Sequence, residues 1–513
     1  MKNYFLLPVL LVAVFQWGNA QEVPQFTRQD TLRGSITPER AWWDLTYYHL
    51  KVAVNPADST FRGENDIHFR AVDEGSVLQV DLQEPMKINS VTMDDQELDF
   101  EKDGNAWFVN TGHYFQPGSA GKIRVQFEGT PKVSRRPPWD GGVSWRFDEN
   151  GSPFIATANQ GDGASLWWPC KDHMYDEPDS MLISVTTPGN LMDVSNGRLR
   201  AGTDNPDGTK TWHWFVSNPI SNYVVNVNVA DYVHFGEVYQ GEKGPLDCDY
   251  YVLDYNLEKA KAHFTEVPRM LEAFEYWFGP YPFYEDGFKL VEVPYPGMEH
   301  QSSVTYGNGY QNGFGGRDIS QTGWGEKFDF IIIHESGHEW FANNITYRDI
   351  ADMWVHESFI AYSEGLFVEY HWGKEAMAEY LRGVRSNIAH DRPIVGLYDV
   401  NYRGSGDMYP KGANMLHTLR QVINNDERWR SILRGLNDEF YHQTVSGRQI
   451  EDFINDHTDW DLDAFFDQYL RQTTTPTLEY RFMDDRLTYR WTNCVLDFDM
   501  PVKVEINGKE TWL

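Results

Sequence analysis

Residues 327–344 read KFDFIIIHESGHEWFANN, and this stretch constrains the architecture of the chain more than any other. An apolar run from Phe330 to Ile333 leads directly into HESGH and favours a buried helix. His334 and His338 are four residues apart, so a helix carries both imidazoles on one face, about one turn apart. Because buried neutral histidines need polar partners, we expect the two rings to share one.

A metal ion is the shared partner that this spacing favours. Two histidines spaced in this way can both bind one Zn²⁺, with Glu335 beside the ion as a base. A third ligand must come from another element, because one helix face cannot surround an ion. Glu357 follows His338 after eighteen intervening residues, in the helical stretch MWVHESFIAYSE (353–364). We therefore predict one zinc ion per chain, bound by His334, His338 and Glu357. The alternative is a solvated helix with two incidental histidines, and the apolar run argues against it.

The composition indicates a globular chain of several domains. A length of 513 residues exceeds one ordinary core, so roughly two to four domains are expected. Aromatic residues make up 15% of the chain, with 19 tryptophans, which indicates large packed side chains and much β-structure. The formal net charge of −32 argues against a nucleic-acid partner, because no basic stripe is present to meet phosphates. A solvated acidic surface explains this charge most simply.

The N-terminus has the pattern of a secretory signal peptide. Residues 1–20 read MKNYFLLPVLLVAVFQWGNA, in which one lysine precedes an apolar core and small residues end the segment. Cleavage is expected near Ala20, which predicts an exported protein, periplasmic or extracellular. The apolar run is short for a retained anchor, and no other stretch is apolar enough to span a bilayer, so no stable membrane anchor is predicted. The oligomeric state is left open.

Changes of pattern divide the rest of the chain into three domains. Residues 21–237 alternate apolar and polar in short runs, which is typical of an antiparallel β-domain, either a sandwich or a curved open sheet. Residues 238–472 are mainly helical, with helical patterns at 255–279, 326–342, 351–372 and 411–424. Residues 473–513 return to strands, and either pack on the rest or begin a further β-domain. The predicted fold class is multidomain α+β.

Two other features have plain interpretations. The Gly-rich segment GNGYQNGFGGR (307–317) lacks the ending of a phosphate-binding loop. A connector is the simpler interpretation, and a mobile loop near the site is the alternative. The three cysteines, Cys170, Cys248 and Cys494, are too few for a disulfide framework, so buried free thiols are expected, although the sequence allows one bridge.

Two more motifs flank the metal helix in sequence. Glu299 stands in PYPGMEHQSS (294–303), a Pro- and Gly-flanked segment typical of an extended edge strand that can pair with a bound peptide. Tyr409 stands in GDMYPKGANML (406–416), just before a predicted helix, where its hydroxyl could donate to a developing oxyanion. Taken alone, each also fits a simpler interpretation: an exposed carboxylate and an aromatic residue at a helix entry.

In this order, PGMEH, HESGH with Glu357, and YPKG resemble the motifs GxMEN, HExxH-x18-E and Y-x-KG. These are shared by the zinc aminopeptidases of the alanyl aminopeptidase (aminopeptidase N) and leukotriene hydrolase family, the gluzincins. Supporting matches are WWPCKDH around Cys170 and YWFGPYPF around Phe278. The resemblance implies an N-terminal β-saddle, a thermolysin-like catalytic domain and a following β-domain, of which this chain has a short C-terminal β segment.

The resemblance also implies roles for individual residues. His334, His338 and Glu357 match the zinc ligands, and Glu335 matches the general base that activates the water on the metal. Tyr409 matches the residue that stabilises the oxyanion together with zinc. The remaining matches are Glu299 for binding of the substrate's free amine, Gly297 and Met298 for the substrate-binding motif, Gln160 (ten residues before Cys170) for a further contact to the amine, and Glu364 for support of the metal ligands. The implied activity is removal of the N-terminal residue from peptides.

Three positions depart from the family pattern. Pro296 stands where the first Gly of GxMEN belongs and removes a backbone donor, and His300 replaces the Asn of that motif. Ser165 stands where an Arg is usual. Because these departures leave the substrate open, a zinc hydrolase of a non-peptide such as an epoxide is one alternative. A non-catalytic binding protein is another, although a binder needs no general base.

Overall fold

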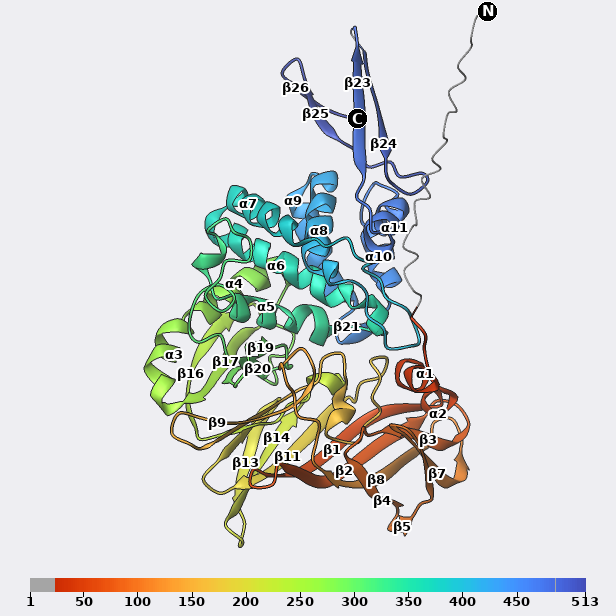
Figure 1. Cartoon of the computed structure of the whole chain (residues 1–513), viewed down its shortest axis with the longest axis vertical. Coiled ribbons are helices and arrows are strands. Elements are labelled where there is room, and N and C mark those ends of the chain that lie inside the picture. The colour runs from red at the N-terminus through yellow and green to blue at the C-terminus, as the bar shows by residue number, and fades with distance from the viewer. Residues whose placement is uncertain (1–23, 485) are drawn as a thin grey trace, which may run out of the picture.

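The computed structural model describes residues 24–484 and 486–513, with a β-rich half below a helical half (Figure 1). This arrangement confirms the predicted multidomain α+β fold. The predicted signal peptide, residues 1–20, lies outside the described residues. Among the described helices, none combines the length and apolar character that crossing a membrane requires.

Three sheets make up the β-rich half. The largest has eight strands in the order β13-β14-β11-β1-β2-β8-β4-β5. At its centre, β1 (Trp43–Asn55) pairs antiparallel with β2 (Thr60–Ala71) and parallel with β11 (Ser180–Pro188). The parallel pair departs from the purely antiparallel domain that the sequence predicts, and it joins strands separated by a long excursion of the chain that a local pattern does not reveal.

The other strands of the large sheet are β4 (Lys87–Met93), β5 (Gln96–Glu97), β8 (Ala120–Gly129), β13 (Arg198–Asp204) and β14 (Thr209–Val216). A second sheet contains β3 (Gly75–Asp81), β6 (Phe100–Asp103) and β7 (Ala106–Phe115). A third contains β9 (Gly142–Phe147), β10 (Pro153–Ala158), β12 (Met192–Val194) and β15 (Asn228–Ala230).

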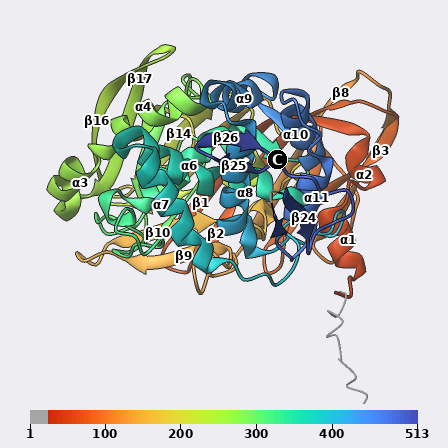
Figure 2. The ribbon, with the colours of Figure 1, turned by 90° about the horizontal axis from the view of Figure 1, so that it is seen from above.

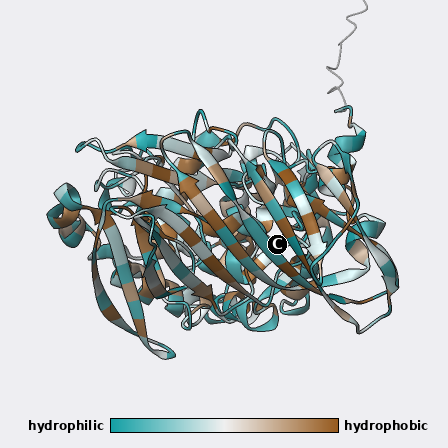
Figure 3. Ribbon diagram, turned by 90° about the horizontal axis from the view of Figure 1, so that it is seen from below, coloured by the Kyte–Doolittle hydropathy of each residue, from teal (hydrophilic) through white to brown (hydrophobic). Residues whose placement is uncertain are grey.

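The large sheet is amphipathic, as the alternating sequence predicts. Seen from below, hydrophobic and hydrophilic residues alternate along its strands (Figure 3). On β1, Tyr48, Leu50, Val52 and Val54 are buried and their neighbours are partly exposed. A slip of one residue would turn this apolar set towards solvent, so burial fixes the register of the strand.

Two short helices that the sequence patterns did not predict precede β1. α1 (Arg28–Gly34) begins at a capping box, and α2 (Pro38–Ala41) begins at a proline. The segment bridges the two halves of the molecule. Gln29 donates to Asp103 at 2.9 Å in the β-rich half, and Phe26 packs edge-to-face on Tyr402 of the helical half, with ring centres 5.7 Å apart.

A five-stranded sheet, in the order β16-β17-β18-β20-β19, begins the helical half. Its strands are β16 (Tyr232–Gly241), β17 (Gly244–Leu253), β18 (Phe288–Glu292), β19 (Gly297–Met298) and β20 (Val304–Tyr306). β16 crosses the domain boundary predicted between residues 237 and 238, and its pairing with β17 places it in this sheet. β19 is an edge strand and pairs antiparallel with β20.

The segment predicted as one helix at 255–279 forms two, α3 (Leu257–His263) and α4 (Glu266–Phe278). Pro268 explains the break, because an uninterrupted helix would need its missing N–H. In the first turn of α4 that N–H is not required. Gly279, with φ 97°, ends α4 in a conformation that favours glycine. The remaining helices are α7 (Lys374–Val384), α8 (Pro410–Ile423), α9 (Asp426–Glu439), α10 (Gly447–Asp456) and α11 (Asp463–Arg471), and β21 (Ile345–Tyr347) pairs with β22 (Gln443–Val445) among them.

Two helices form the centre of the helical half. α5 (Phe330–Gly337) is shorter than the predicted 326–342, because Asp329 caps its start by accepting from the N–H groups of Ile331 and Ile332. Residues Glu339–Asn344 then form an irregular turn in which Phe341 and Ala342 leave helical geometry. α6 (Trp354–Trp372) is buried on every side from Trp354 to Val368, including the polar residues His356, Glu357 and Glu364.

The C-terminal β segment forms two hairpins. β23 (Thr477–Met483) pairs with β24 (Arg486–Thr492), and β25 (Lys503–Ile506) pairs with β26 (Lys509–Trp512). They project from the helical half and, seen from above, lie within its outline (Figures 1 and 2). The sequence predicts three strands here, and the structure has four. The three cysteines are free, and Cys170 and Cys248 are buried, as expected.

Candidate metal and active site

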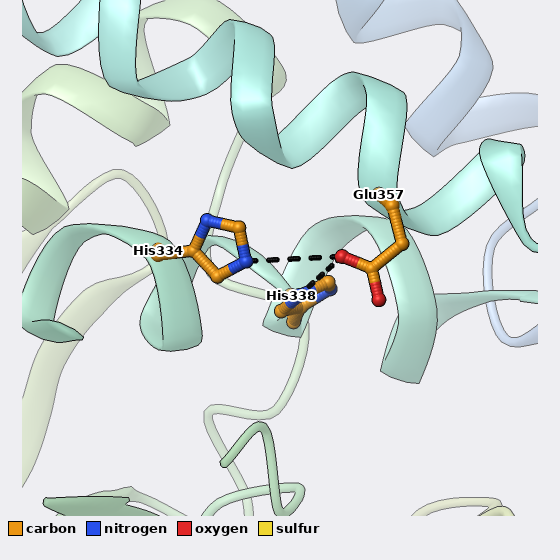
Figure 4. Close-up of side chains that lie close together, drawn as sticks. All are labelled: His334, His338 and Glu357. Carbon is orange, nitrogen blue, oxygen red and sulfur yellow. Dashed lines mark ion pairs between the residues drawn. The ribbon is translucent and has the colours of Figure 1, made fainter. Parts of the chain in front are cut away.

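The three predicted zinc ligands converge between α5 and α6 (Figure 4). His334 Nε2 lies 3.7 Å from Glu357 Oε2, and His338 Nε2 lies 3.5 Å from the same oxygen. The exposed fractions of the three residues are 7%, 1% and 1%. α5 carries His334, and His338 caps its C-terminal end one turn further along, with helical dihedral angles. The packing of α6 against α5 brings Glu357 to both histidines.

The geometry of this triad fits a zinc ion. Glu357 Oε2 is buried and accepts no hydrogen bond from the described residues, although it faces both Nε2 atoms. Ligands of a tetrahedral zinc at about 2.1 Å lie about 3.4 Å from one another. The two separations are close to this value, so small shifts bring all three atoms onto one ion. Two imidazoles and one carboxylate are also a donor set typical of catalytic zinc sites.

The other nitrogen of each imidazole is already engaged. His334 Nδ1 lies 2.8 Å from Glu364 Oε1, and the other oxygen of Glu364 accepts from the Tyr380 hydroxyl at 2.6 Å. His338 Nδ1 lies 3.1 Å from the carbonyl oxygen of Phe341. The irregular turn after α5 therefore positions the carbonyl oxygen of Phe341 next to the His338 ring. These contacts leave both Nε2 atoms to face the metal position.

Glu299, Glu335 and His338 also lie close enough to share an ion. This second set has only one imidazole, and Glu299 Oε1 already accepts from Gln160 Nε2 at 2.6 Å and from the Tyr223 hydroxyl at 3.2 Å. The first triad, whose carboxylate oxygen has no partner, is therefore the better metal site. The second set places the Glu335 carboxylate beside the metal position and beside Glu299.

Glu299 is held at the junction of the two halves of the molecule. It follows the edge strand β19, and its carbonyl oxygen accepts from Asn343 at 3.0 Å. Gln160, which follows β10 in the N-terminal domain, donates through Nε2 to Glu299 and, at 2.9 Å, to Glu357 Oε1. Both carboxylates accept hydrogen bonds from the side-chain amide nitrogen of Gln160. The side-chain carbonyl oxygen of Gln160 is therefore the atom that remains to accept a hydrogen bond from a ligand.

The motif around β19 leaves no room for larger side chains. A Cβ on Gly297 would lie 2.5 Å from Ile331 Cγ2 and 3.2 Å from Glu335 Cγ. Only glycine therefore allows the edge strand to approach the metal helix. Met298 is 1% exposed and pairs with Thr305 of β20. The strand positions backbone and carboxylate groups beside the metal helix.

Three buried carboxylates dominate the electrostatics of the site. Burial, with the neighbouring Glu335 and Glu357, raises the pKa of Glu299 to about 8. Burial raises the pKa of Glu335 to about 7. Burial would also raise the pKa of Glu357, but His338 and His334 outweigh it and hold that pKa at about 2. A cation offsets the cost of ionising these buried groups, so the site favours a divalent ion at the triad and a single positive charge beside Glu299.

The ring of Tyr409 packs against the ring of His334. The two rings are stacked with centres 6.1 Å apart, and Tyr409 immediately precedes α8. Burial raises the pKa of its phenol well above the usual value, and Glu357 raises it further, so the hydroxyl keeps its proton and can donate it in a hydrogen bond. Tyr409, His334, Glu335 and Glu299 all line one cavity of about 180 Å³.

The three departures from the family pattern have local explanations. Pro296 accepts from Gly307 N at 2.7 Å and lines the cavity, so its ring replaces a flexible glycine at the site. His300 is fully buried and bonds to Thr305 through Nδ1 at 3.2 Å, and it does not line the cavity. Ser165 donates its backbone N–H to Asp172 at 3.0 Å, and Arg33 of α1 pairs with the same carboxylate at 3.2 Å. An arginine is therefore present there, supplied by another segment.

Several residues of the site carry no signal in the sequence. Tyr223 is buried and bonds to Glu299, Phe314 comes from the Gly-rich segment, and Trp139 and Arg403 line the cavity from other loops. The Gly-rich segment thus lies at the site, as the alternative interpretation predicts, and its mobility stays a prediction. The other three residues belong to no motif, and only the fold brings them to the cavity.

Comparison with known proteins matches both halves of the molecule. The family model "Peptidase M1 N-terminal domain" matches residues 45–224, and "Peptidase family M1 domain" matches residues 262–469. A crystal structure of a mutant M1 zinc metallopeptidase from Deinococcus radiodurans, bound to a Tyr-Ser-Ala substrate, superposes with a TM-score of 0.71. It is 20% identical, and the match covers 86% of this chain and 98% of that one.

Curated relatives are similar at low identity. Aminopeptidase N of Lactococcus lactis subsp. lactis is 21% identical over 493 residues, covering 86% of this chain and 52% of the relative. Leucine aminopeptidase 2 of Vanderwaltozyma polyspora is 22% identical over 454 residues, covering 86% and 62%. The chain thus spans about half the length of the first of these relatives and less than two thirds of the second.

Proposed function

The chain belongs to peptidase family M1, and we propose that it is a zinc-dependent aminopeptidase that removes the N-terminal residue from peptides. One observation carries this proposal. A buried carboxylate, Glu299, lies beside the metal triad immediately after the edge strand β19, with its pKa raised to about 8. Such a group is stabilised by a cation, and the α-ammonium of a peptide is a cation at one fixed place on the substrate.

The position of Glu299 sets which bond is broken. An ammonium bound by Glu299 and the carbonyl oxygen of Gln160 places the first peptide bond next to the triad, because one residue spans only about 3.5 Å. β19 is an edge strand, so its free backbone groups can pair with the substrate chain. Without this carboxylate, the metal helix alone would not select the first peptide bond over the others.

Each remaining group has a task in hydrolysis. When bound at the triad, a zinc ion supplies Lewis-acid chemistry, which polarises a carbonyl and acidifies water. Glu335, which is buried beside the metal position, takes a proton from the attacking water and delivers it to the leaving amine. Tyr409 donates a hydrogen bond to the oxygen that becomes negative. Gln160 and Tyr223 hold the Glu299 carboxylate in position.

A panel of aminoacyl amides and their N-acetylated counterparts tests the proposal. The protein should contain about one zinc per chain. It should hydrolyse free-amine substrates, lose activity with a chelator and leave the acetylated substrates intact. A lipid epoxide in the same panel tests the other branch of the family. Equal cleavage of acetylated and free substrates would contradict recognition of the amine.

We further propose that the protein is exported. Support comes from residues 1–20, whose lysine, apolar core and terminal Ala20 form a signal-peptide pattern. The N-terminal sequence of the mature protein, taken from the secreted or periplasmic fraction, should begin at Gln21. A cytoplasmic protein that retains residue 1 would refute the proposal.

A further inference from the structure

The active-site cavity has a closed end and an open end. Glu299 is 2% exposed and Glu335 9%, so the groups that meet the amine and the scissile bond are deep in the cavity. Trp139 is 64% exposed and Arg403 is also exposed, yet both line the same cavity. A peptide bound with its amine at Glu299 therefore extends towards Trp139 and Arg403.

Arg403 is distinctive among the cavity residues. It is the one arginine or lysine that lines the cavity in the described part of the chain. It forms no hydrogen bond or ion pair with the described residues, although the chain carries a net charge of −32 and acidic side chains are abundant. Its guanidinium also acts on Tyr409: burial raises the pKa of that phenol, and Arg403 opposes the increase. The cation thus lies near the position of the scissile carbonyl.

The loop that carries Arg403 is held in place. Its neighbour Gly404 packs so closely that a Cβ there would lie 1.6 Å from the carbonyl oxygen of Ile394. Arg392 donates to the Gly404 carbonyl at 3.2 Å, and Leu397 N donates to the Tyr402 carbonyl at 3.0 Å. An unpaired guanidinium on an anchored loop is ready to bind an anion without first giving up an existing partner.

We propose that Arg403 binds a carboxylate of the substrate on the C-terminal side of the scissile bond and so selects short or acidic peptides. The guanidinium fork matches a carboxylate in a bidentate manner. In an extended peptide, the C-terminal carboxylate is about 7 Å from the amine in a dipeptide and about 10 Å in a tripeptide. An acidic side chain just after the scissile bond offers the same chemistry. This inference rests on the proposed aminopeptidase activity.

Matched substrates separate these sources of a carboxylate. The series Leu-Gly, Leu-Gly-Gly and Leu-Gly-Gly-Gly is assayed as free acids and as C-terminal amides, and Leu-Asp-amide is compared with Leu-Asn-amide. Wild type is compared with Arg403→Gln and Arg403→Lys. The control is Arg62→Gln, which removes an exposed arginine of β2 that lines no part of the active-site cavity. Thermal unfolding of each variant confirms that it is folded.

The expected result is a selective loss. Wild type should prefer the free acid over the amide at one length, or Asp over Asn. Arg403→Gln should remove that preference, with a loss of about 10- to 100-fold in kcat/KM that appears in KM and spares the neutral substrates. Arg403→Lys should recover part of it, and Arg62→Gln should change nothing. A response in the pairs of free acid and amide identifies the C-terminal carboxylate as the ligand of Arg403. A response in the pair of Leu-Asp-amide and Leu-Asn-amide identifies the acidic side chain.

Two outcomes would overturn the assignment. Equal losses on acids and amides, appearing in kcat, would mean that Arg403 acts through Tyr409 and not on a substrate carboxylate. Unchanged kinetics in Arg403→Gln would mean that the guanidinium contacts no substrate group. If wild type hydrolyses neither amides nor acids, the proposed aminopeptidase function itself fails, and that result is distinct from both.

Discussion

The metal triad lies next to a second cluster, Glu299, Gln160 and Tyr223, to which we assign amine binding, and the two are built in different ways. His334 lies on an eight-residue helix, His338 caps the C-terminal end of that helix, and Glu357 lies on the helix that packs against it, all within one domain. Glu299 follows an edge strand of the catalytic domain, and Gln160 and Tyr223 come from two segments of the N-terminal domain. The metal site is thus built locally, by α5, its C-cap and α6. Under the proposed function, the choice of bond depends on how the two domains meet.

Loss of a metal ligand should have the largest effect. In His338→Ala, the triad loses one of three donors and cannot hold zinc tightly, so turnover should fall below detection. The unfolding temperature should also decrease, because the buried carboxylates lose their divalent counterion. Zinc content and thermal unfolding, with and without added zinc, measure both effects. Full zinc content in this variant would show that Glu299 and Glu335 can complete a site, in conflict with the separation of the two clusters.

Glu335→Gln tests the residue where the two clusters meet. The substitution keeps the shape of the side chain and leaves the triad intact, so zinc should be retained. Turnover should fall by about 10⁴, because the amide cannot take the proton of the attacking water. Zinc analysis together with kcat on a chromogenic aminoacyl amide provides the measurement. Near-normal turnover would assign the base to another group.

Tyr409→Phe tests the proposed role of the Tyr409 hydroxyl as a hydrogen-bond donor to the oxyanion. We expect kcat to fall by about 10²–10³ with little change in KM, since the phenol donates to an oxygen that gains charge only during reaction. The stacked contact with His334 is preserved by phenylalanine, so the fold should be unaffected. An effect confined to KM would indicate instead that Tyr409 positions the substrate.

The same contrast explains what the sequence could predict. HESGH and Glu357 could be interpreted because helical spacing converts positions in the chain into positions in space, whereas Gln160 was reached only by a counted offset. Gln160 and Tyr223 lie 139 and 76 residues from Glu299, and no local pattern connects them to it. The parallel pairing of β1 with β11 and the break between α3 and α4 were likewise missed. The strand pairing is non-local, and the helix break depends on a single proline. Neither feature can be predicted from alternation or helical periodicity.

Glu299→Ala should affect recognition more than chemistry. Removing the carboxylate takes away the partner of the ammonium, so KM for free-amine substrates should rise by about 10- to 100-fold. Reactivity towards N-acetylated substrates should be unchanged, since these carry no charge for Glu299 to bind. Zinc should remain, because Glu299 is not one of the three ligands. A loss of zinc in this variant, or a fall in kcat with KM unchanged, would place Glu299 with the metal cluster.

Tyr223→Phe is the smallest change and the most direct test of the domain interface. The lost hydrogen bond to Glu299 is 3.2 Å long and is one of two that hold this carboxylate oxygen, the other coming from Gln160 at 2.6 Å. Losing the weaker contact should therefore raise KM by about threefold to tenfold and leave kcat and zinc content unchanged. Gln160→Ala is the matched comparison, since it removes the shorter bond from the same domain and should cost more. If the two variants rank in the opposite order, or if Tyr223→Phe lowers kcat alone, the N-terminal domain does not position the amine through these contacts.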